Sequence, residues 1–356
     1  MTHTIIIKNL VILLILSILL LTASCKKTDL SLLGNNITCY AAAYNKGVYK
    51  SDNGGISWYP LVQDQDDIYL YSKKIFLSPD SKRLYVTTTG NGLFFIDMGK
   101  GVLNSVSEFR DEDVRSIVFR KSVDGQVPGF DILVGKKEAG VYKAAEGTNT
   151  WGDFNNGLTY RDVNVLYQGA GVIYAGTING LFKFDEGSGI WLDISQVIKN
   201  KNILSIGADP EGKTIYAGAG VYQNNKGRFE GIPSLYKSTD KGSTWENADK
   251  GIPDDTLIFS IAVNPLRPER IYLGTSEGIY RSTDGGAKWA KTDNGIPDKY
   301  KALDIKIAHL SDGRDLIYTA GANGLYMALD EKKPVWASRS YGLDETYISS
   351  ILIPTK

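Results

Sequence analysis

The chain has 356 residues, in which 40 Lys and Arg balance 40 Asp and Glu, and it contains two His and two Cys. The balanced charge argues against a nucleic-acid-binding protein, which would carry a basic excess, and two Cys are too few for a disulfide framework. Two His argue against a His-based metal site or catalytic triad, while 38 Gly and 21 Tyr favour short strands and tight turns over helices.

The first 24 residues have the pattern of a signal peptide. Within residues 1–9 the only charged side chain is Lys8, and the run LVILLILSILLL follows at 10–21. Twelve helical residues rise about 18 Å, which is too short for a hydrocarbon core of about 30 Å. The run therefore predicts the hydrophobic region of a cleaved secretory signal rather than a transmembrane helix.

The sequence LTASC at 21–25 resembles the lipobox of bacterial lipoproteins, although Thr22 replaces the usual Leu. The resemblance implies that Cys25 is acylated and becomes the mature N-terminus, with residues 25–36 as a tether to the membrane. The residue after this Cys is Lys26 and not Asp. By resemblance to Gram-negative sorting rules, the absence of Asp at this position implies the outer membrane. The alternative is an ordinary cleaved signal in which the Cys is incidental.

From Ile37 onward the sequence repeats one unit seven times. Each unit has a strand of the IYAGT type, a second strand of the GLYKS type and a polar loop. The aromatic residue of the second strand recurs at Tyr49, Phe94, Tyr142, Phe182, Tyr236, Tyr280 and Tyr326. The spacings of 45, 48, 40, 54, 44 and 46 residues match the period of a four-stranded propeller blade.

All six Trp residues occupy one position of this repeat. They are Trp58, Trp151, Trp191, Trp245, Trp289 and Trp336. The first five lie nine residues after the strand aromatic, the last lies ten after it, and the second unit has none. A residue type confined to one repeat position indicates a packing anchor for each blade.

A third strand type, of the form V-x-S-I, is predicted to lie next to the axis, where only small side chains such as Ser fit. Val114–Ile117 and Ile258–Ile261 are examples. The first unit has no such strand before Ile37, whereas the last unit is followed by an unassigned one at Tyr347–Ile353. We expect these two ends to pair and so remove the exposed edges. The sequence thus predicts an all-β fold, a single seven-bladed β-propeller of four-stranded antiparallel blades over residues 37–356.

Three loops share the pattern Ser-x-Asp/Asn-x-Gly-x-x-Trp, with Asn53, Asp240 and Asp284 at its third position. Such a side chain can accept a hydrogen bond from a backbone N–H two residues on, and Gly supplies a left-handed conformation. The pattern resembles the Asp box of BNR-repeat propellers, a family that includes sialidases, xyloglucanase-type glycoside hydrolases, sortilin-type receptors and photosystem II assembly factors. The resemblance implies the propeller fold and no particular activity.

A calcium loop is the functional alternative for these three loops. Calcium takes about six to eight oxygen ligands, and one loop offers only two or three. We therefore expect no metal and no cofactor.

The loops that lead into the innermost strands are charged and would meet at one axial mouth. The candidate ligand rim consists of Asp66, Asp67, Asp113, Arg115, Tyr160, Arg161, Asp162, Asp254, Asp255, Asp298, Tyr300, Asp344 and Tyr347. One interpretation is that the Asp residues start turns and keep the loops solvated. The other is a rim of mixed charge, with Tyr160, Tyr300 and Tyr347 as stacking surfaces for a glycan or a protein loop.

Two functions remain open. The first is a membrane-anchored, monomeric, non-enzymatic binding or scaffold module for a protein or glycan. The second is a glycoside hydrolase that uses two rim carboxylates about 5–9.5 Å apart. A sialidase would need an Arg cluster, of which only Arg115 and Arg161 are candidates, and six blades; a xyloglucanase-type enzyme normally uses two propellers. These departures favour the binding module. The photosystem assembly factors are single seven-bladed rings with a basic patch, and the mixed rim argues against carrying their role over.

Overall fold

The computed structural model describes residues 30, 33–62, 71–122, 129–148, 150–223, 229–343 and 346–354. The chain divides into two units, Met1–Leu33 and Gly34–Lys356, and the fold is that of the second. The signal-peptide run and Cys25 lie outside the described residues, as do Asp66, Asp67 and Asp344. Within the described residues, no helix has the length and apolar character needed to cross a bilayer.

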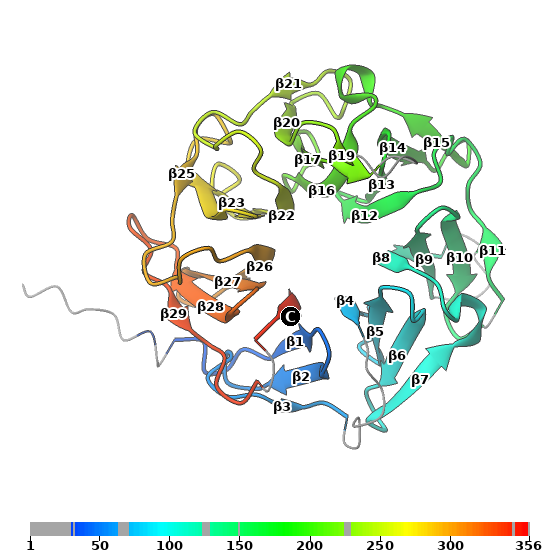
Figure 1. Cartoon of the computed structure of the whole chain (residues 1–356). Coiled ribbons are helices and arrows are strands. Elements are labelled where there is room, and N and C mark those ends of the chain that lie inside the picture. Colours follow the sequence, from blue (N-terminus) through cyan, green and yellow to red (C-terminus); the bar gives the residue numbers. More distant parts are fainter. Residues whose placement is uncertain are drawn as a thin grey trace, which may run out of the picture. The chain divides into compact units, whose positions relative to one another are not determined.

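Seven four-stranded antiparallel sheets surround a central axis, which confirms the predicted seven-bladed propeller (Figure 1). From the axis outward, the first three blades contain β30 (Ile348–Leu352), β1 (Cys39–Ala43), β2 (Gly47–Ser51) and β3 (Tyr59–Pro60); β4 (Ser72–Leu77), β5 (Arg83–Thr88), β6 (Leu93–Asp97) and β7 (Val102–Val106); and β8 (Val114–Lys121), β9 (Phe130–Lys136), β10 (Gly140–Ala145) and β11 (Gly152–Asp153).

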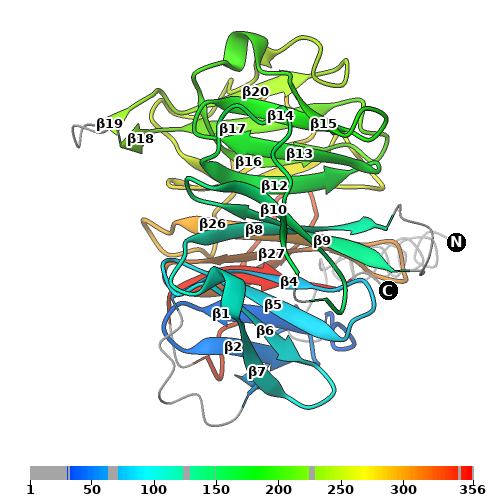
Figure 2. The same ribbon diagram turned by 90° about the vertical axis from the view of Figure 1, so that its right-hand side faces the viewer.

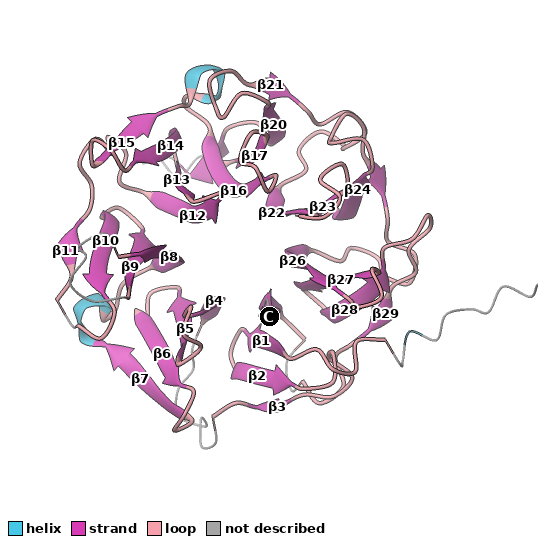
Figure 3. Ribbon diagram, turned by 180° about the vertical axis from the view of Figure 1, so that it is seen from behind, coloured by secondary structure: helices cyan, strands magenta, loops and turns pink. Residues whose placement is uncertain are grey.

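The remaining blades contain β12 (Val163–Gly169), β13 (Val172–Thr177), β14 (Gly180–Asp185) and β15 (Ile190–Asp193); β16 (Asn202–Ala208), β17 (Ile215–Gly220), β20 (Ser234–Ser238) and β21 (Glu246–Asn247); β22 (Ile258–Val263), β23 (Ile271–Thr275), β24 (Gly278–Ser282) and β25 (Ala290–Lys291); and β26 (Ala302–His309), β27 (Asp315–Gly321), β28 (Gly324–Leu329) and β29 (Ala337–Ser338). A small hairpin, β18 (Tyr222–Gln223) and β19 (Phe229–Glu230), extends from the fifth blade beyond the ring (Figure 2). Two short 3-10 helices, η2 (Ser107–Phe109) and η3 (Gln196–Ile198), lie at the outer edge (Figure 3).

The two ends of the propeller close the ring as predicted. The last strand, β30, pairs antiparallel with β1, so that Ala41 lies opposite Ile351. Consecutive innermost strands contact one another all the way round the axis, including β26 with β30 and β30 with β4. No blade edge next to the axis is therefore left without a neighbour, which protects the ring from edge-to-edge association.

The Trp residues join each blade to the one before it. The indole N–H of Trp58 donates to the carbonyl of Arg339 at 2.6 Å, across the point where the chain ends meet. Trp191, Trp245, Trp289 and Trp336 make the corresponding bond to the preceding blade at 2.7–2.8 Å. Trp151 instead packs edge-on against Phe109, with ring centroids 4.7 Å apart.

The loops around Asn53, Asp240 and Asp284 share one hydrogen-bond pattern. In the second of them, Asp240 accepts from the backbone N–H of Thr244 at 2.8 Å, and Ser238 Oγ accepts from the N–H of Gly242 at 2.8 Å. The backbone donor to Asp240 thus lies four residues on, not two as expected from an Asx turn. The difference arises because the Ser hydroxyl occupies the closer donors. Gly242 has φ = 88°, a left-handed conformation that favours Gly.

Candidate functional site

Every innermost strand carries a β-bulge at the same place. In β8, Val114 lies opposite Lys136 and Ser116 lies opposite Gly135, which leaves Arg115 as the extra residue. In blade order, the seven extra residues are Ser349, Lys73, Arg115, Asn164, Leu204, Phe259 and Leu303. A bulge re-aims the side chain that it leaves unpaired, and bulges recur at barrel rims and active sites. The repeat therefore presents one side chain per blade at the start of each inner strand.

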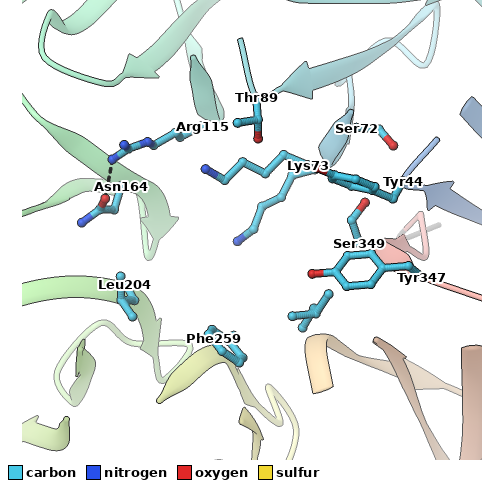
Figure 4. Close-up of a pocket in the computed structure, with 12 residues that line it drawn as sticks. Tyr44, Ser72, Lys73, Thr89, Arg115, Asn164, Leu204, Phe259, Tyr347 and Ser349 are labelled. Atoms are coloured by element: carbon cyan, nitrogen blue, oxygen red, sulfur yellow. Dashed lines mark hydrogen bonds between the residues drawn. The ribbon is translucent and has the colours of Figure 1, made fainter. Parts of the chain in front are cut away.

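All seven extra residues line one cavity of about 310 Å³ at the axial mouth (Figure 4). Tyr44, Ser72, Lys74, Thr89 and Tyr347 complete its wall. In Figure 4, the labelled side chains of Lys73, on β4, and Tyr347, just before β30, extend into a common space, and Arg115 reaches Asn164 across the wall. The mouth predicted from the sequence is thus a real hollow, built mainly by the bulges.

The cavity wall has a polar side and an apolar side. The bulge residues of blades two to four are Lys73, Arg115 and Asn164, whereas those of blades five to seven are Leu204, Phe259 and Leu303. The first blade, between them, adds two aromatic rings. The rings of Tyr44 and Tyr347 meet edge to face with centroids 5.2 Å apart, and Tyr347 is 40% exposed.

Arg115 is the centre of a network on the polar side. Its Nη1 lies 2.6 Å from Asp162 Oδ1 and 2.6 Å from Asn164 Oδ1, and its Nε lies 3.3 Å from Asp113 Oδ2. Asn164 in turn donates to the carbonyl of Ile203 in the next blade at 3.0 Å. Three protein oxygens therefore bind this guanidinium through Nε and Nη1, and they fix its orientation.

Two Lys side chains on β4 are less well satisfied. The ammonium of Lys73 has Asp113 as its counter-ion at 3.8 Å, a long contact. The ammonium of Lys74 makes no hydrogen bond or ion pair within the described residues, although the charge of Asp304 acts on it. Burial lowers the pKa of Lys73 to about 8, because the charge of Asp113 only partly offsets the loss of water. Burial likewise lowers the pKa of Lys74.

One carboxylate, Asp304, lies beyond the bulge on β26 and is 2% exposed. Its oxygens accept from Ser260 Oγ at 3.2 Å, Ser350 Oγ at 2.8 Å and Lys306 Nζ at 2.7 Å, and so join three blades. Burial opposes ionisation of Asp304, but the charges of Lys306 and Lys74 outweigh it and hold its pKa below the usual range. Asp304 is thus an ionised structural group.

Of the ten predicted rim residues that the structure describes, four lie at the cavity, four are exposed outside its lining and two are tyrosines that pack against the core. Arg115 and Tyr347 line the cavity, and Asp113 and Asp162 border it through Arg115. Four exposed residues lie outside the lining, namely Arg161, Asp254, Asp255 and Asp298, and Arg161 pairs with Asp153 at 3.6 Å.

Of the two remaining rim tyrosines, Tyr300 belongs to the core and Tyr160 is half-buried against it. Tyr300 is 1% exposed, and its hydroxyl lies 3.2 Å from the carbonyl of Gly324. Tyr160 packs against Phe182 between the third and fourth blades, with ring centroids 6.3 Å apart. Both precede an inner strand, and the sequence alone does not tell whether such a ring turns inward or outward.

Most of the cavity residues were not among the predicted site residues. Lys73, Lys74, Leu204, Phe259 and Leu303 carry no motif of their own. A signal was present, because the bulge residue is the variable x of the V-x-S-I strands, next to a recurring Ser. The Ser hydroxyls bridge blades, as when Ser205 Oγ donates to the carbonyl of Ile258 at 2.8 Å. The x position faces the cavity instead.

The described part of the chain offers little support for metal binding or for a nucleophilic thiol. No group of three or more His, Cys, Asp or Glu there could hold a metal ion. The thiol of Cys39 is fully buried, and burial raises its pKa to about 12, so it is a poor nucleophile.

No family model matches the chain, and no curated protein matches it in sequence. Solved structures share its fold. The extracellular domain of the one-component system BT4673 from B. thetaiotaomicron has a TM-score of 0.58 and 15% identity, over 88% of this chain and 48% of that one. The Niastella koreensis GH74 enzyme has a TM-score of 0.63 and 16% identity, over 88% and 53%.

The designed protein Ika8 has a TM-score of 0.56 and 10% identity, over 91% of this chain and 93% of that one. The present chain spans about half the length of the two natural proteins. Identities this low show the fold alone.

Proposed function

We propose that this propeller is a non-enzymatic binding module that takes its ligand, a protein or a glycan, at the axial mouth. The observation that carries the proposal is the set of seven bulges, which place seven side chains of six kinds around one cavity. A purely structural ring needs no such variation, since identical small residues would pack equally well there. Concave sites with few polar groups on a largely apolar wall are typical of ligand binding.

The carboxylates near the cavity suit binding better than catalysis. Asp113 and Asp162 both accept hydrogen bonds from Arg115 and do not line the cavity, so neither is placed to donate a proton to a ligand there. A glycoside hydrolase needs one carboxyl that stays protonated to act as general acid. Asp304 is held ionised by its neighbours, so it does not fill that role either.

The hydrolase remains the second candidate because the Niastella koreensis GH74 enzyme shares the fold. The neighbour from a one-component system is an extracellular domain, and it supports the binding module instead. Each of these proteins is about twice as long as the matched region, so neither activity transfers by fold.

We also propose that the chain is a monomeric outer-membrane lipoprotein attached through Cys25, and that its Ser-x-Asp loops are Asp boxes of the BNR type. The apolar run at 10–21 and the LTASC sequence support the first part. The shared hydrogen bonds around Asn53, Asp240 and Asp284 support the second.

One experiment separates the two functions. The full-length protein is tested on a panel of immobilised glycans and peptides, and its release of reducing sugar from the same polysaccharides is measured. We expect retention on at least one panel member, lost in Lys73→Met/Phe259→Ala and kept in Lys82→Met/Lys213→Met on the opposite face, without sugar release. Sugar release that Asp113→Asn or Asp162→Asn abolishes would establish the hydrolase instead.

A further inference from the structure

The charged side chains that line the axial cavity are all positive, and the carboxylates of Asp113 and Asp162 border it. Lys73, Lys74 and Arg115 are the charged residues of its wall, and no Asp or Glu lines it. The guanidinium of Arg115 is occupied by Asp113 and Asp162. The two ammonium groups of β4 are what remains available to a ligand, since one has only a 3.8 Å counter-ion contact and the other has none within the described residues.

These ammonium groups lie in a place where an anion would be held firmly. Both have lost part of their water, since the side chain of Lys73 is 37% exposed and Lys74 is half-buried. Desolvated charges interact more strongly than exposed ones, because the local dielectric is lower. An anion that enters the cavity replaces the missing water and removes the penalty for keeping the lysines charged.

The other wall of the cavity recognises a different part of the ligand. Leu204, Phe259 and Leu303 come from three consecutive blades and are half-buried at the mouth. No hydrogen-bonding side chain lies among these three, so this wall accepts an apolar body. The cavity of about 310 Å³ is at the lower end of the size of small-molecule sites, about 300–1,000 Å³.

We infer that the axial cavity binds a small organic carboxylate, with the carboxylate at Lys73 and Lys74 and an apolar body against Leu204, Phe259 and Leu303. This inference rests on the proposed function in that the ligand enters the axial mouth; it narrows a protein ligand to its C-terminal group and adds a free small acid as a second source. A carboxylate has two oxygens, so it can accept one hydrogen bond from each of the two ammonium groups. The carboxylate is either that of a free small molecule or the C-terminal group of a peptide with an apolar last residue.

Isothermal titration calorimetry on the purified full-length protein at pH 7 tests the inference. The probes are 3-phenylpropanoate, its neutral amide, acetate, inorganic phosphate, galacturonate, and the peptide Gly-Gly-Gly-Phe with a free or an amidated C-terminus. We expect 3-phenylpropanoate to bind at least tenfold more tightly than its amide, acetate, phosphate and galacturonate, since a hydrogen-bonded charge pair contributes roughly tenfold or more. A free-acid peptide that binds as tightly identifies the C-terminus as the source, and one that does not identifies the free acid.

Variants locate the two halves of the ligand. Lys73→Met and Lys74→Met should each weaken binding of 3-phenylpropanoate about tenfold or more, and Phe259→Ala should weaken it about fivefold while leaving acetate unchanged. Lys213→Met, on the opposite face, should change nothing. Circular dichroism and the thermal midpoint of each variant establish that the ring remains folded.

The contrary outcomes are specific. If the amide binds as tightly as 3-phenylpropanoate, the cavity does not recognise a carboxylate. If galacturonate or phosphate binds more tightly than 3-phenylpropanoate, the cavity does not recognise an apolar body. If no carboxylate binds at 20 mM while the glycan and peptide panel still gives mouth-dependent retention, the inference fails and the proposed function stands. If the panel gives no such retention either, both fail.

Discussion

Arg115 and Asp162, which are 47 residues apart in the sequence, form an ion pair across two neighbouring blades, with 2.6 Å between Nη1 and Oδ1. The same guanidinium bonds Asn164, whose amide reaches the next blade at Ile203. Three consecutive blades are therefore tied together at the polar side of the axial cavity. These bonds fix the part of the cavity wall next to β4, the strand that carries Lys73 and Lys74.

Removing this guanidinium should destabilise the ring. We expect Arg115→Met to lower the free energy of unfolding by about 1–3 kcal/mol, because it leaves Asp113 and Asp162 without the donor that compensates their partial burial. Urea denaturation measures the change. Arg314→Met is the matched control, since its pair with Asp312 is exposed and should contribute less than about 1 kcal/mol. Equal losses in the two variants would contradict this role of Arg115.

The lowered pKa of Lys73 has a consequence for stability against pH. The folded protein releases this proton near pH 8, whereas the unfolded chain keeps it to about 10.5. Between these values the unfolded state binds more protons, so stability relative to Lys73→Met should rise as pH increases from 8 to 10.5. The charges that face the ammonium are Lys74 on its own strand, Asp113 and Arg115 at β8, and Asp162 before β12.

Urea midpoints at pH 7, 8, 9 and 10 check this expectation for the wild type and Lys73→Met. The difference in urea midpoint between the wild type and the variant, taken at each pH, removes the titration of the groups that both proteins share. A difference that stays constant over this range would mean that Lys73 is solvated as an ordinary surface lysine.

Asp304 should respond to acid in the opposite direction. Its carboxylate is ionised in the fold and accepts from Ser260, Ser350 and Lys306. Because its folded pKa is lowered, the stability that it contributes is present above about pH 4 and is lost as pH falls through the folded value. We expect Asp304→Asn to cost about 1–3 kcal/mol at pH 7 and less below pH 4.

Thermal unfolding at pH 7 and pH 3 measures both effects. Asp254→Asn, at an exposed position, is the control and should shift stability by no more than about 0.5 kcal/mol. A loss for Asp304→Asn that is the same at both pH values would show that the charge of this carboxylate is not what stabilises the ring.

The bond from Trp58 to Arg339 joins the first blade to the last. Trp58→Phe keeps an aromatic ring but removes the donor, so we expect it to cost about 1 kcal/mol more than Trp151→Phe. The indole of Trp151 makes no hydrogen bond within the described residues and serves as the matched control. Guanidinium denaturation compares the two variants. Equal losses of unfolding free energy would mean that strand pairing, and not the Trp58 bond, closes the ring.

The proposed lipid anchor has a separate test. Cys25→Ser should move the protein from the detergent phase to the aqueous phase in Triton X-114 partitioning, because it removes the acylated thiol. Ser24→Ala, which leaves the Cys in place, should partition as the wild type does. Unchanged partitioning of Cys25→Ser would mean that the chain is not a lipoprotein.

The fold was predictable because its signals repeat. A Trp nine residues after each strand aromatic fixes the register of a blade, and the unassigned strand at Tyr347–Ile353 has only one vacancy to fill. Strand β23 is buried along its whole length between its neighbouring blades, so its sequence is apolar without alternation.

The site was predictable only in outline. Charged loops before the inner strands indicated where the mouth would lie, and Arg115 and Tyr347 do line it. The recurring Ser marks the position of Leu204 and Phe259 in the repeat but does not show that the register shifts there, and a shift of one residue reverses which side chains face the axis. Tyr300 shows the converse, because the carbonyl of Gly324 that receives its hydroxyl is 24 residues away.

The proposed function depends on the ligand binding at the axial cavity, where Lys73 and Lys74 lie. Binding at this location is measured most directly by acetylating lysines with a water-soluble ester, in the presence and absence of a bound panel ligand, and reading each site by mass spectrometry. We expect the ligand to protect Lys73 and Lys74 from acetylation, while Lys213 on the opposite face is labelled at an unchanged rate. Protection of Lys213, or full labelling of Lys73 and Lys74 with the ligand bound, would contradict the proposed function.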